Sequence, residues 1–139
     1  MGKRPTSVLH LRAGKALGRK TPKYRNIKVT YDGRTFDSKA ELKRYQDLCL
    51  LQKANKIFEL KCQHPIKLMC GGKTVMQRSA RYWKNGRQVH YICDFRYWDT
   101  SRTPNQYVYE DVKGKDTPLS ALKRAVVETE YGIRIEIVR

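Results

Sequence analysis

The chain has 139 residues, of which 30 are Lys or Arg and 13 are Asp or Glu, so its formal net charge is +17. This length suits one domain, and a hydrophobic fraction of 40% excludes a wholly disordered basic tail. No apolar run approaches the roughly 20 residues of a membrane helix, and the first residues lead into no stretch like a secretory signal. We therefore expect a soluble, cytoplasmic protein.

The first segment of the chain is uniformly basic. Every charged residue before Asp32 is Lys or Arg, and the segment has no sustained apolar period. This composition predicts a flexible basic arm over residues 1–25 that binds a polyanion, followed by a folded domain over residues 26–139. We expect the arm to contact nucleic-acid phosphates through Lys20, Lys23 and Arg25.

A turn, a helix and an extended segment are predicted next. Tyr31-Asp32-Gly33-Arg34 indicates a turn between short extended pieces. Phe36-Asp37-Ser38 leads into a helix that runs to about Ala54. Ile57 to Met69 is predicted to be one long bent strand or two short ones, with Pro65 at an edge or bend. The helix has an apolar face formed by Leu42, Tyr45, Leu48 and Cys49.

A hairpin is predicted from Thr74 to Trp98, closed at Asn85-Gly86, which is the pair favoured for a type I′ turn. No acidic residue lies between Lys61 and Cys93, and basic residues there alternate with aromatic ones. Such a surface neutralises phosphates and stacks on bases. The alternative is a solvated hairpin with ordinary Lys and Arg. The predicted DNA contacts are Arg78, Arg81, Lys84 and Arg87.

The last part of the chain alternates strand, helix and strand. Gln106 to Lys113 is predicted to be a strand, and Thr117-Pro118 to start a helix that runs to about Glu130. Alternating Ile133, Ile135 and Ile137 indicate a half-buried strand. The order predicts an α/β fold of the mixed α+β kind, one sheet flanked by helices. The second helix is expected to bury a face formed by Leu119, Leu122 and Val126.

Three carboxylates lie in apolar surroundings, where an unpaired charge costs free energy. Glu41 falls within the apolar face of the first helix, Asp94 in a predicted central strand, and Asp111 on the strand face that also carries Lys113. Two or three carboxylates can hold Mg²⁺, which bridges to phosphate oxygens and activates water. A lysine beside the metal can orient that water. This combination is typical of a phosphodiester hydrolase.

The spacing of Asp94 and Asp111-Val112-Lys113, with Glu41 on a preceding helix, resembles the PD-(D/E)xK nucleases. More narrowly, it is similar to small phage-encoded endonucleases that resemble Holliday junction resolvases. The segments that carry the likeness are Phe36 to Glu41, Tyr91 to Phe95 and Tyr109 to Gly114, within roughly Lys23 to Val138. The proline that names the motif is Cys93 here.

This resemblance implies a restriction-endonuclease-like core: a helix, a three-stranded antiparallel meander, a second helix and a fourth strand. It implies a Mg²⁺ or Mn²⁺ cofactor bound by Asp94, Asp111 and the Val112 carbonyl. Lys113 would position the attacking water, and Glu41 would be an outer ligand, through water, or a metal-linked base. The implied activity is cleavage of branched DNA in recombination by a homodimer in the cytoplasm of a bacterial host.

Each of these residues has an alternative role. Ser38-x-x-Glu41 is a capping box, Asp111 and Lys113 could form a surface ion pair, and Asp94 could accept a hydrogen bond from an amide. Glu110 is the rival of Asp111, but it shares its strand face with Val108 and Val112. The remaining candidates for holding the scissile strand, or for an ordinary solvated face, are Lys115, Lys123 and Arg124.

Two broader alternatives follow from the same composition. The chain could be a non-catalytic basic nucleic-acid-binding protein, because the basic surface alone would bind phosphates. The four cysteines form no CxxC pair, so we interpret them as free thiols rather than as ligands that join His64 and His90 in a zinc site.

Overall fold

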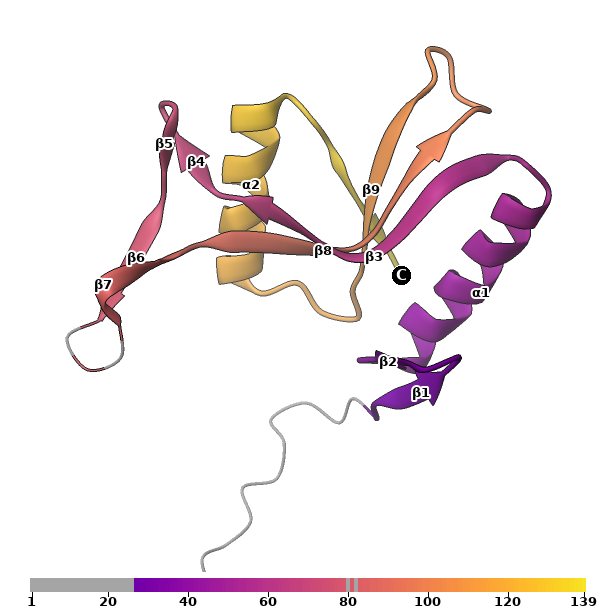
Figure 1. Ribbon diagram of the computed structural model, residues 1–139, viewed down its shortest axis with the longest axis horizontal. Helices are drawn as coiled ribbons and strands as arrows, with labels where there is room; N and C mark the ends of the chain where they lie inside the picture. Colours follow the sequence, from indigo (N-terminus) through magenta and orange to yellow (C-terminus); the bar gives the residue numbers. More distant parts are fainter. Residues whose placement is uncertain (1–26, 80, 82) are drawn as a thin grey trace, which may run out of the picture.

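The computed structural model describes residues 27–79, 81 and 83–139 (Figure 1). The predicted basic arm, with Lys20, Lys23 and Arg25, lies outside these residues. Among them, no helix is long and apolar enough to cross a membrane. The described part of the chain forms two helices and ten strands. In order they are β1 (Val29–Tyr31), β2 (Arg34–Phe36), α1 (Lys39–Lys53), β3 (Ile57–Lys67), β4 (Met69–Cys70), β5 (Lys73–Thr74), β6 (Met76–Ser79), β7 (Trp83–Gln88), β8 (His90–Asp99), β9 (Gln106–Val112), α2 (Pro118–Tyr131) and β10 (Ile135–Val138).

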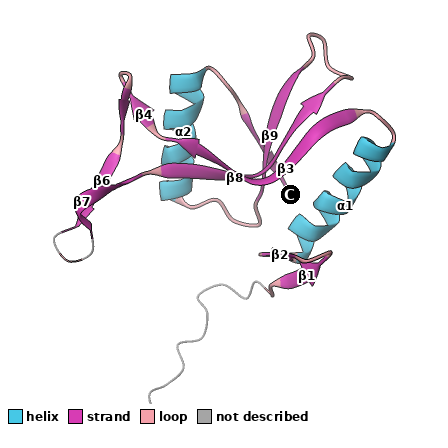
Figure 2. Ribbon diagram, viewed as in Figure 1, coloured by secondary structure: helices cyan, strands magenta, loops and turns pink. Residues whose placement is uncertain are grey.

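The central sheet has four strands in the order β10-β9-β8-β3 (Figure 2). Strands β3, β8 and β9 pair antiparallel, and β10 adds to β9 in parallel. A parallel neighbour needs a crossover connection, which α2 supplies between β9 and β10. The result is the predicted α+β order of helix, antiparallel meander, helix and strand, and Pro65 lies on the edge strand β3, where its missing N–H is tolerated.

Helix α1 forms where the sequence predicts it. The Ser38 hydroxyl caps it by accepting a hydrogen bond from the backbone N–H of Glu41, and the helix ends at Ala54. Glu41, Tyr45 and Leu48 are its buried residues, so the predicted apolar face is confirmed. This face packs into a core cluster formed by Phe36, Tyr45, Leu48, Ile57, Phe95, Tyr97 and Val108.

Helix α2 begins at the predicted cap, Thr117, but buries only part of the predicted face. Leu119 and Leu122 are 64% and 63% exposed, whereas Val127 is fully buried. The prediction is therefore wrong for the two leucines and right for Val126, because α2 joins the core through its second half, where Val126 and Val127 pack. That second cluster contains Ile66, Leu68, Tyr91, Cys93, Val127 and Ile135.

The hairpin prediction is also wrong in its turn. Strand β6 pairs with β7, so Asn85-Gly86 lies inside β7, and the predicted second strand of the hairpin, β8, pairs with β3 and β9 instead. The register shifts between Gln77 and Ser79, opposite Asn85-Gly86, and Gly86 has a φ of +84°. A glycine with positive φ serves a bulge as well as a turn, and here the strand pairing selects the bulge.

Candidate functional site

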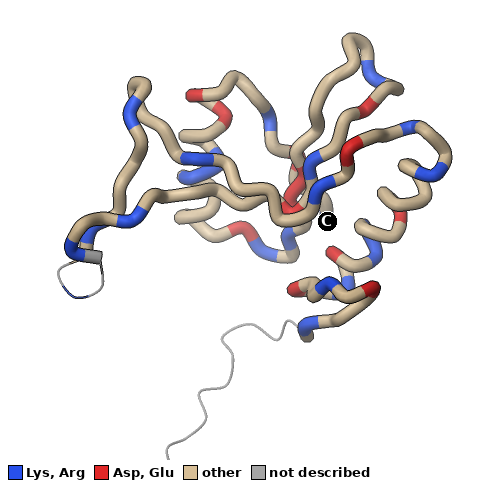
Figure 3. The backbone as a smooth tube through the Cα atoms, viewed as in Figure 1, with Lys and Arg blue, Asp and Glu red and all other residues tan. Residues whose placement is uncertain are grey.

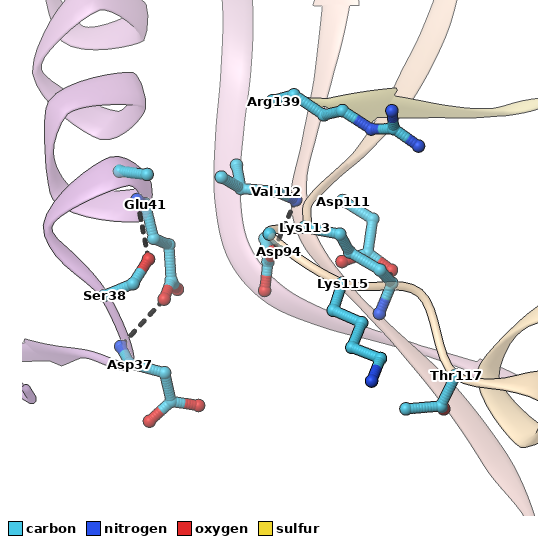
Figure 4. Close-up of a pocket in the computed structure, with 12 residues that line it drawn as sticks. Asp37, Ser38, Glu41, Asp94, Asp111, Val112, Lys113, Lys115, Thr117 and Arg139 are labelled. Atoms are coloured by element: carbon cyan, nitrogen blue, oxygen red, sulfur yellow. Dashed lines mark hydrogen bonds and ion pairs between the residues drawn. The ribbon is translucent and has the colours of Figure 1, made fainter. Parts of the chain in front are cut away.

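An open pocket of about 650 Å³ lies between the start of α1 and the end of β9 (Figure 4). Its walls come from the first turn of α1, from β8, from the end of β9 with the loop that follows, and from the residue after β10. The structure thereby brings together all the residues that the sequence predicts for chemistry, from three separate segments of the chain. They are Glu41, Asp94, Asp111, Val112 and Lys113.

Asp111 is held in place by two neighbours. The Tyr91 hydroxyl donates a hydrogen bond to Asp111 Oδ2, and Lys113 Nζ lies 3.1 Å from the same oxygen. The side chains of Asp111 and Lys113 are only 5% and 21% exposed, so this is not a surface ion pair. Burial raises the pKa of Tyr91, and the Asp111 charge raises it further, so the hydroxyl keeps its proton and remains a donor.

Asp94 faces Asp111 from the neighbouring strand. Its Oδ2 accepts a hydrogen bond from the backbone N–H of Val112 at 2.7 Å, which fixes the carboxylate against the end of β9. Burial raises the pKa of Asp94 to about 7, and the charges of Asp111 and Glu41 add to this effect, while the Val112 N–H opposes it. Carboxylates that repel one another in this way favour the binding of a cation.

Glu41 performs the capping role and also faces the pocket. Its Oε2 accepts a hydrogen bond from the backbone N–H of Asp37 at 2.8 Å, while Ser38 Oγ accepts from the backbone N–H of Glu41 at 3.1 Å. Its other oxygen, Oε1, accepts from Gln63 Nε2 at 2.8 Å. Burial is the main cause that raises the Glu41 pKa. The two interpretations of this residue are therefore compatible, because each uses a different oxygen.

Glu110 does not reach the pocket. It is buried on the opposite face of β9, where it binds Arg44 of α1 and accepts a hydrogen bond from the Tyr97 hydroxyl at 2.5 Å. The alternation of side chains along β9 separates this carboxylate from Asp111, as the sequence predicts.

The basic residues predicted to bind DNA are distributed unequally. Lys115 lines the pocket, whereas Lys123 is half-buried elsewhere on α2. Arg124 forms an ion pair with Asp116 at 2.5 Å, and its charge lowers the pKa of Tyr91. It therefore acts on the site through Tyr91 and does not line the pocket. The exposed hairpin β6–β7 projects away from the central sheet (Figure 3). It carries Arg78, Arg81, Lys84 and Arg87.

Three residues of the site were not found from the sequence: Gln63, Tyr91 and Arg139. Gln63 and Tyr91 contact the carboxylates, and Arg139 lines the pocket just after β10. No local pattern marks any of them. Strand β10 pairs with β9 in parallel, with Val138 opposite Val112, and this register places Arg139 beside Lys113. The sequence alone does not indicate that β9 and β10 pair.

The chemistry of the donors fits a hard divalent cation. Mg²⁺ takes oxygen ligands, often one or two carboxylates completed by water and substrate phosphate. Among the residues that the structure describes, no three His, Cys, Asp or Glu side chains are gathered tightly enough to hold a metal by themselves. The donors that fit are therefore two carboxylates, from Asp94 and Asp111, and Val112, whose carbonyl the resemblance adds as a ligand, lines the same pocket.

The comparisons with known proteins identify a family and no function. The model of the family described as "Protein of unknown function (DUF1064)" matches residues 21–138, which include the whole pocket except Arg139. No curated protein and no solved structure matches the chain. The chain belongs to the DUF1064 family of proteins of unknown function.

Proposed function

We propose that this protein is a Mg²⁺- or Mn²⁺-dependent endonuclease that hydrolyses phosphodiester bonds of DNA. The observation that supports the proposal best is the meeting of Asp94, Asp111 and Lys113 in one pocket, with Glu41 on the facing helix. This is the set of residues, in the order along the chain, on which the resemblance to PD-(D/E)xK nucleases rests.

The charge distribution supports the same conclusion. A chain with a net charge of +17 is suited to bind a polyanion, yet four carboxylates line one pocket, where they would repel phosphate. They are Asp37, Glu41, Asp94 and Asp111. A divalent cation converts this repulsion into attraction. When bound, the cation would supply an activated water and neutralise the charge that develops on the phosphate.

The side chains of this protein have distinct tasks in the proposal. Asp94 and Asp111, with the Val112 carbonyl, would hold the cation. Lys113, whose Nζ lies 3.1 Å from Asp111 Oδ2, would orient the attacking water and stabilise the negative charge on the phosphate. Glu41 would act from outside the inner ligand set, as an outer ligand through water or as a base.

The substrate we propose is branched, Holliday-junction-like DNA. Lys115 and Arg139 at the pocket would hold the scissile strand, while the basic residues of the β6–β7 hairpin would contact the backbone of a more distant segment. Symmetric cutting of two strands needs two sites, so we propose a homodimer. The setting would be recombination in the cytoplasm of a bacterium, with the protein encoded by a phage.

The test is cleavage of a labelled four-way junction and of a matched linear duplex, in Mg²⁺ or in EDTA. Wild type should cut only with the metal, and Asp111→Asn should lose the activity. Asp47→Asn removes the same charge at an exposed position of α1 and should cut like wild type. Binding without any metal-dependent cutting of either DNA would contradict the proposal and favour a non-catalytic nucleic-acid-binding protein.

A further inference from the structure

Gln63 interrupts β3 with an unusual backbone conformation. Its φ is +51°, in the left-handed region that residues other than glycine seldom occupy, and such positions cluster at functional sites. Its neighbours Cys62 and His64 pair with Phe95 and Cys93 of β8. Asp94 lies between these two partners on β8, so it is the residue opposite Gln63.

The side-chain amide of Gln63 joins two carboxylates of the pocket. Its Nε2 donates a hydrogen bond to Glu41 Oε1 at 2.8 Å and another to Asp94 Oδ1 at 3.2 Å. The amide nitrogen is the donor in both contacts, and each carboxyl oxygen accepts. The contact spans 22 residues to Glu41 and 31 to Asp94, so it exists only in the folded chain.

The Gln63 amide binds one oxygen of each carboxylate, and a backbone N–H binds the other oxygen. Asp94 Oδ2 is fixed by the Val112 N–H, and Glu41 Oε2 by the Asp37 N–H. The two N–H groups of Gln63 therefore lie where a cation bridging Glu41 and Asp94 would bind. An oxygen has more than one lone pair, so Asp94 Oδ1 can keep the amide and still bind one cation on the side of Asp111.

We propose that Gln63 is a positioning residue that holds Glu41 beside Asp94 and limits the pocket to one divalent cation, bound at Asp94 and Asp111. The inference rests on the proposed function, because it assumes a cation at those two residues. It also assigns Glu41 a place outside the inner ligand set, linked to the metal site through the Gln63 amide.

The test counts Mn²⁺ ions bound per chain by calorimetric titration of the full-length protein, without DNA. Wild type should bind one Mn²⁺. In Gln63→Glu, a third carboxylate replaces the two N–H donors between Glu41 and Asp94, and the count should rise to two. Gln46→Glu makes the same change at an exposed position of α1, outside the pocket, and should bind one.

Two more variants cover the case in which Gln63→Glu fails to fold, which thermal melting would reveal. Gln63→Ala removes the N–H donors without adding charge and should admit a second, weaker Mn²⁺. Adding Glu41→Gln to either variant should return the count to one, because the second ion would need Glu41.

The outcomes separate the two proposals. The role of Gln63 would be overturned if wild type bound two ions, or if wild type and every folded Gln63 variant bound one ion. Either result would leave the proposed function standing. A wild type that binds no Mn²⁺ would overturn the metal site itself, and with it both proposals.

Discussion

Arg44 and Glu110 form a bidentate ion pair that joins α1 to β9, with Arg44 Nε 2.8 Å from Oε2 and Nη2 2.6 Å from Oε1. The adjacent residue, Asp111, faces the pocket on the other side of the strand. Two neighbouring carboxylates thus have different tasks: Glu110 joins β9 to α1 through Arg44, and Asp111 belongs to the candidate site.

The first prediction follows from this ion pair. Glu110→Ala leaves the Arg44 charge without its partner in a largely buried position and should lower the free energy of unfolding by about 3–5 kcal/mol. Asp47→Ala, on the exposed face of α1, should change it by no more than about 0.5 kcal/mol. Urea denaturation followed by circular dichroism measures both. Equal stability of the two variants would show that the ion pair is dispensable.

The second prediction concerns the pH dependence of stability without metal. Burial raises the pKa of Asp94 from 3.8 to about 7. Between these values the folded chain binds a proton that the unfolded chain has lost, so this residue's contribution to stability falls as pH rises and is most unfavourable above pH 7. Asp94→Asn removes the penalty, which is at most about 4 kcal/mol.

Thermal melting in EDTA at pH 4 and pH 8 tests this prediction. Asn can still accept the Val112 N–H, so Asp94→Asn should melt several degrees above wild type at pH 8, and the difference should shrink toward pH 4. A difference that is the same at both pH values would mean that the ionisation of Asp94 is not its cause.

The third prediction concerns Tyr91, whose hydroxyl donates to Asp111 Oδ2. Tyr91→Phe keeps the ring in the second core cluster but frees the Asp111 carboxylate, and it should weaken Mn²⁺ binding by about 10- to 100-fold. Tyr107→Phe is the matched control, because its hydroxyl binds Glu59 at an exposed site. Mn²⁺ affinity unchanged in Tyr91→Phe would exclude a positioning role for the hydroxyl.

The fourth prediction concerns the β6–β7 hairpin. If Arg78 and Lys84 each neutralise one phosphate, replacing both by Ala should reduce the slope of log K against log salt concentration by about 1.8. Mn²⁺ binding should not change, because neither residue lines the pocket. Fluorescence anisotropy of labelled junction DNA at several salt concentrations measures the slope. The control replaces the exposed residues Lys53 and Lys56 by Ala. An equal reduction of the slope in this control would show that the hairpin contributes no more to DNA binding than other exposed lysines.

Features with a local cause could be predicted from the sequence. The 3.6-residue period placed Glu41 on the buried face of α1, and the two-residue period of β9 separated Asp111 from Glu110. The caps at Ser38 and Thr117 located the starts of both helices. These signals depend on the chain within one turn or one strand.

Features that depend on pairing between distant segments could not be predicted. The buried face of α2 depends on where the helix meets the sheet, so the local apolar pattern of Leu119 and Leu122 was misleading. Asn85-Gly86 carried a turn signal that the pairing of β6 with β7 converted into a bulge. Gln63 reaches the site only because β3 lies beside β8, and no residue near it in the sequence indicates this.

Our claim is that the pocket hydrolyses bound DNA and does not only bind it. The most direct measurement compares binding and cutting of one labelled four-way junction in Mg²⁺ by wild type and Asp111→Asn at equal concentrations. The claim predicts that wild type cuts the junction, whereas Asp111→Asn binds it at least as tightly, because a charge that repels phosphate is gone, and leaves it intact. Equal cutting by both proteins, or binding by both with no cutting by wild type, would contradict the claim.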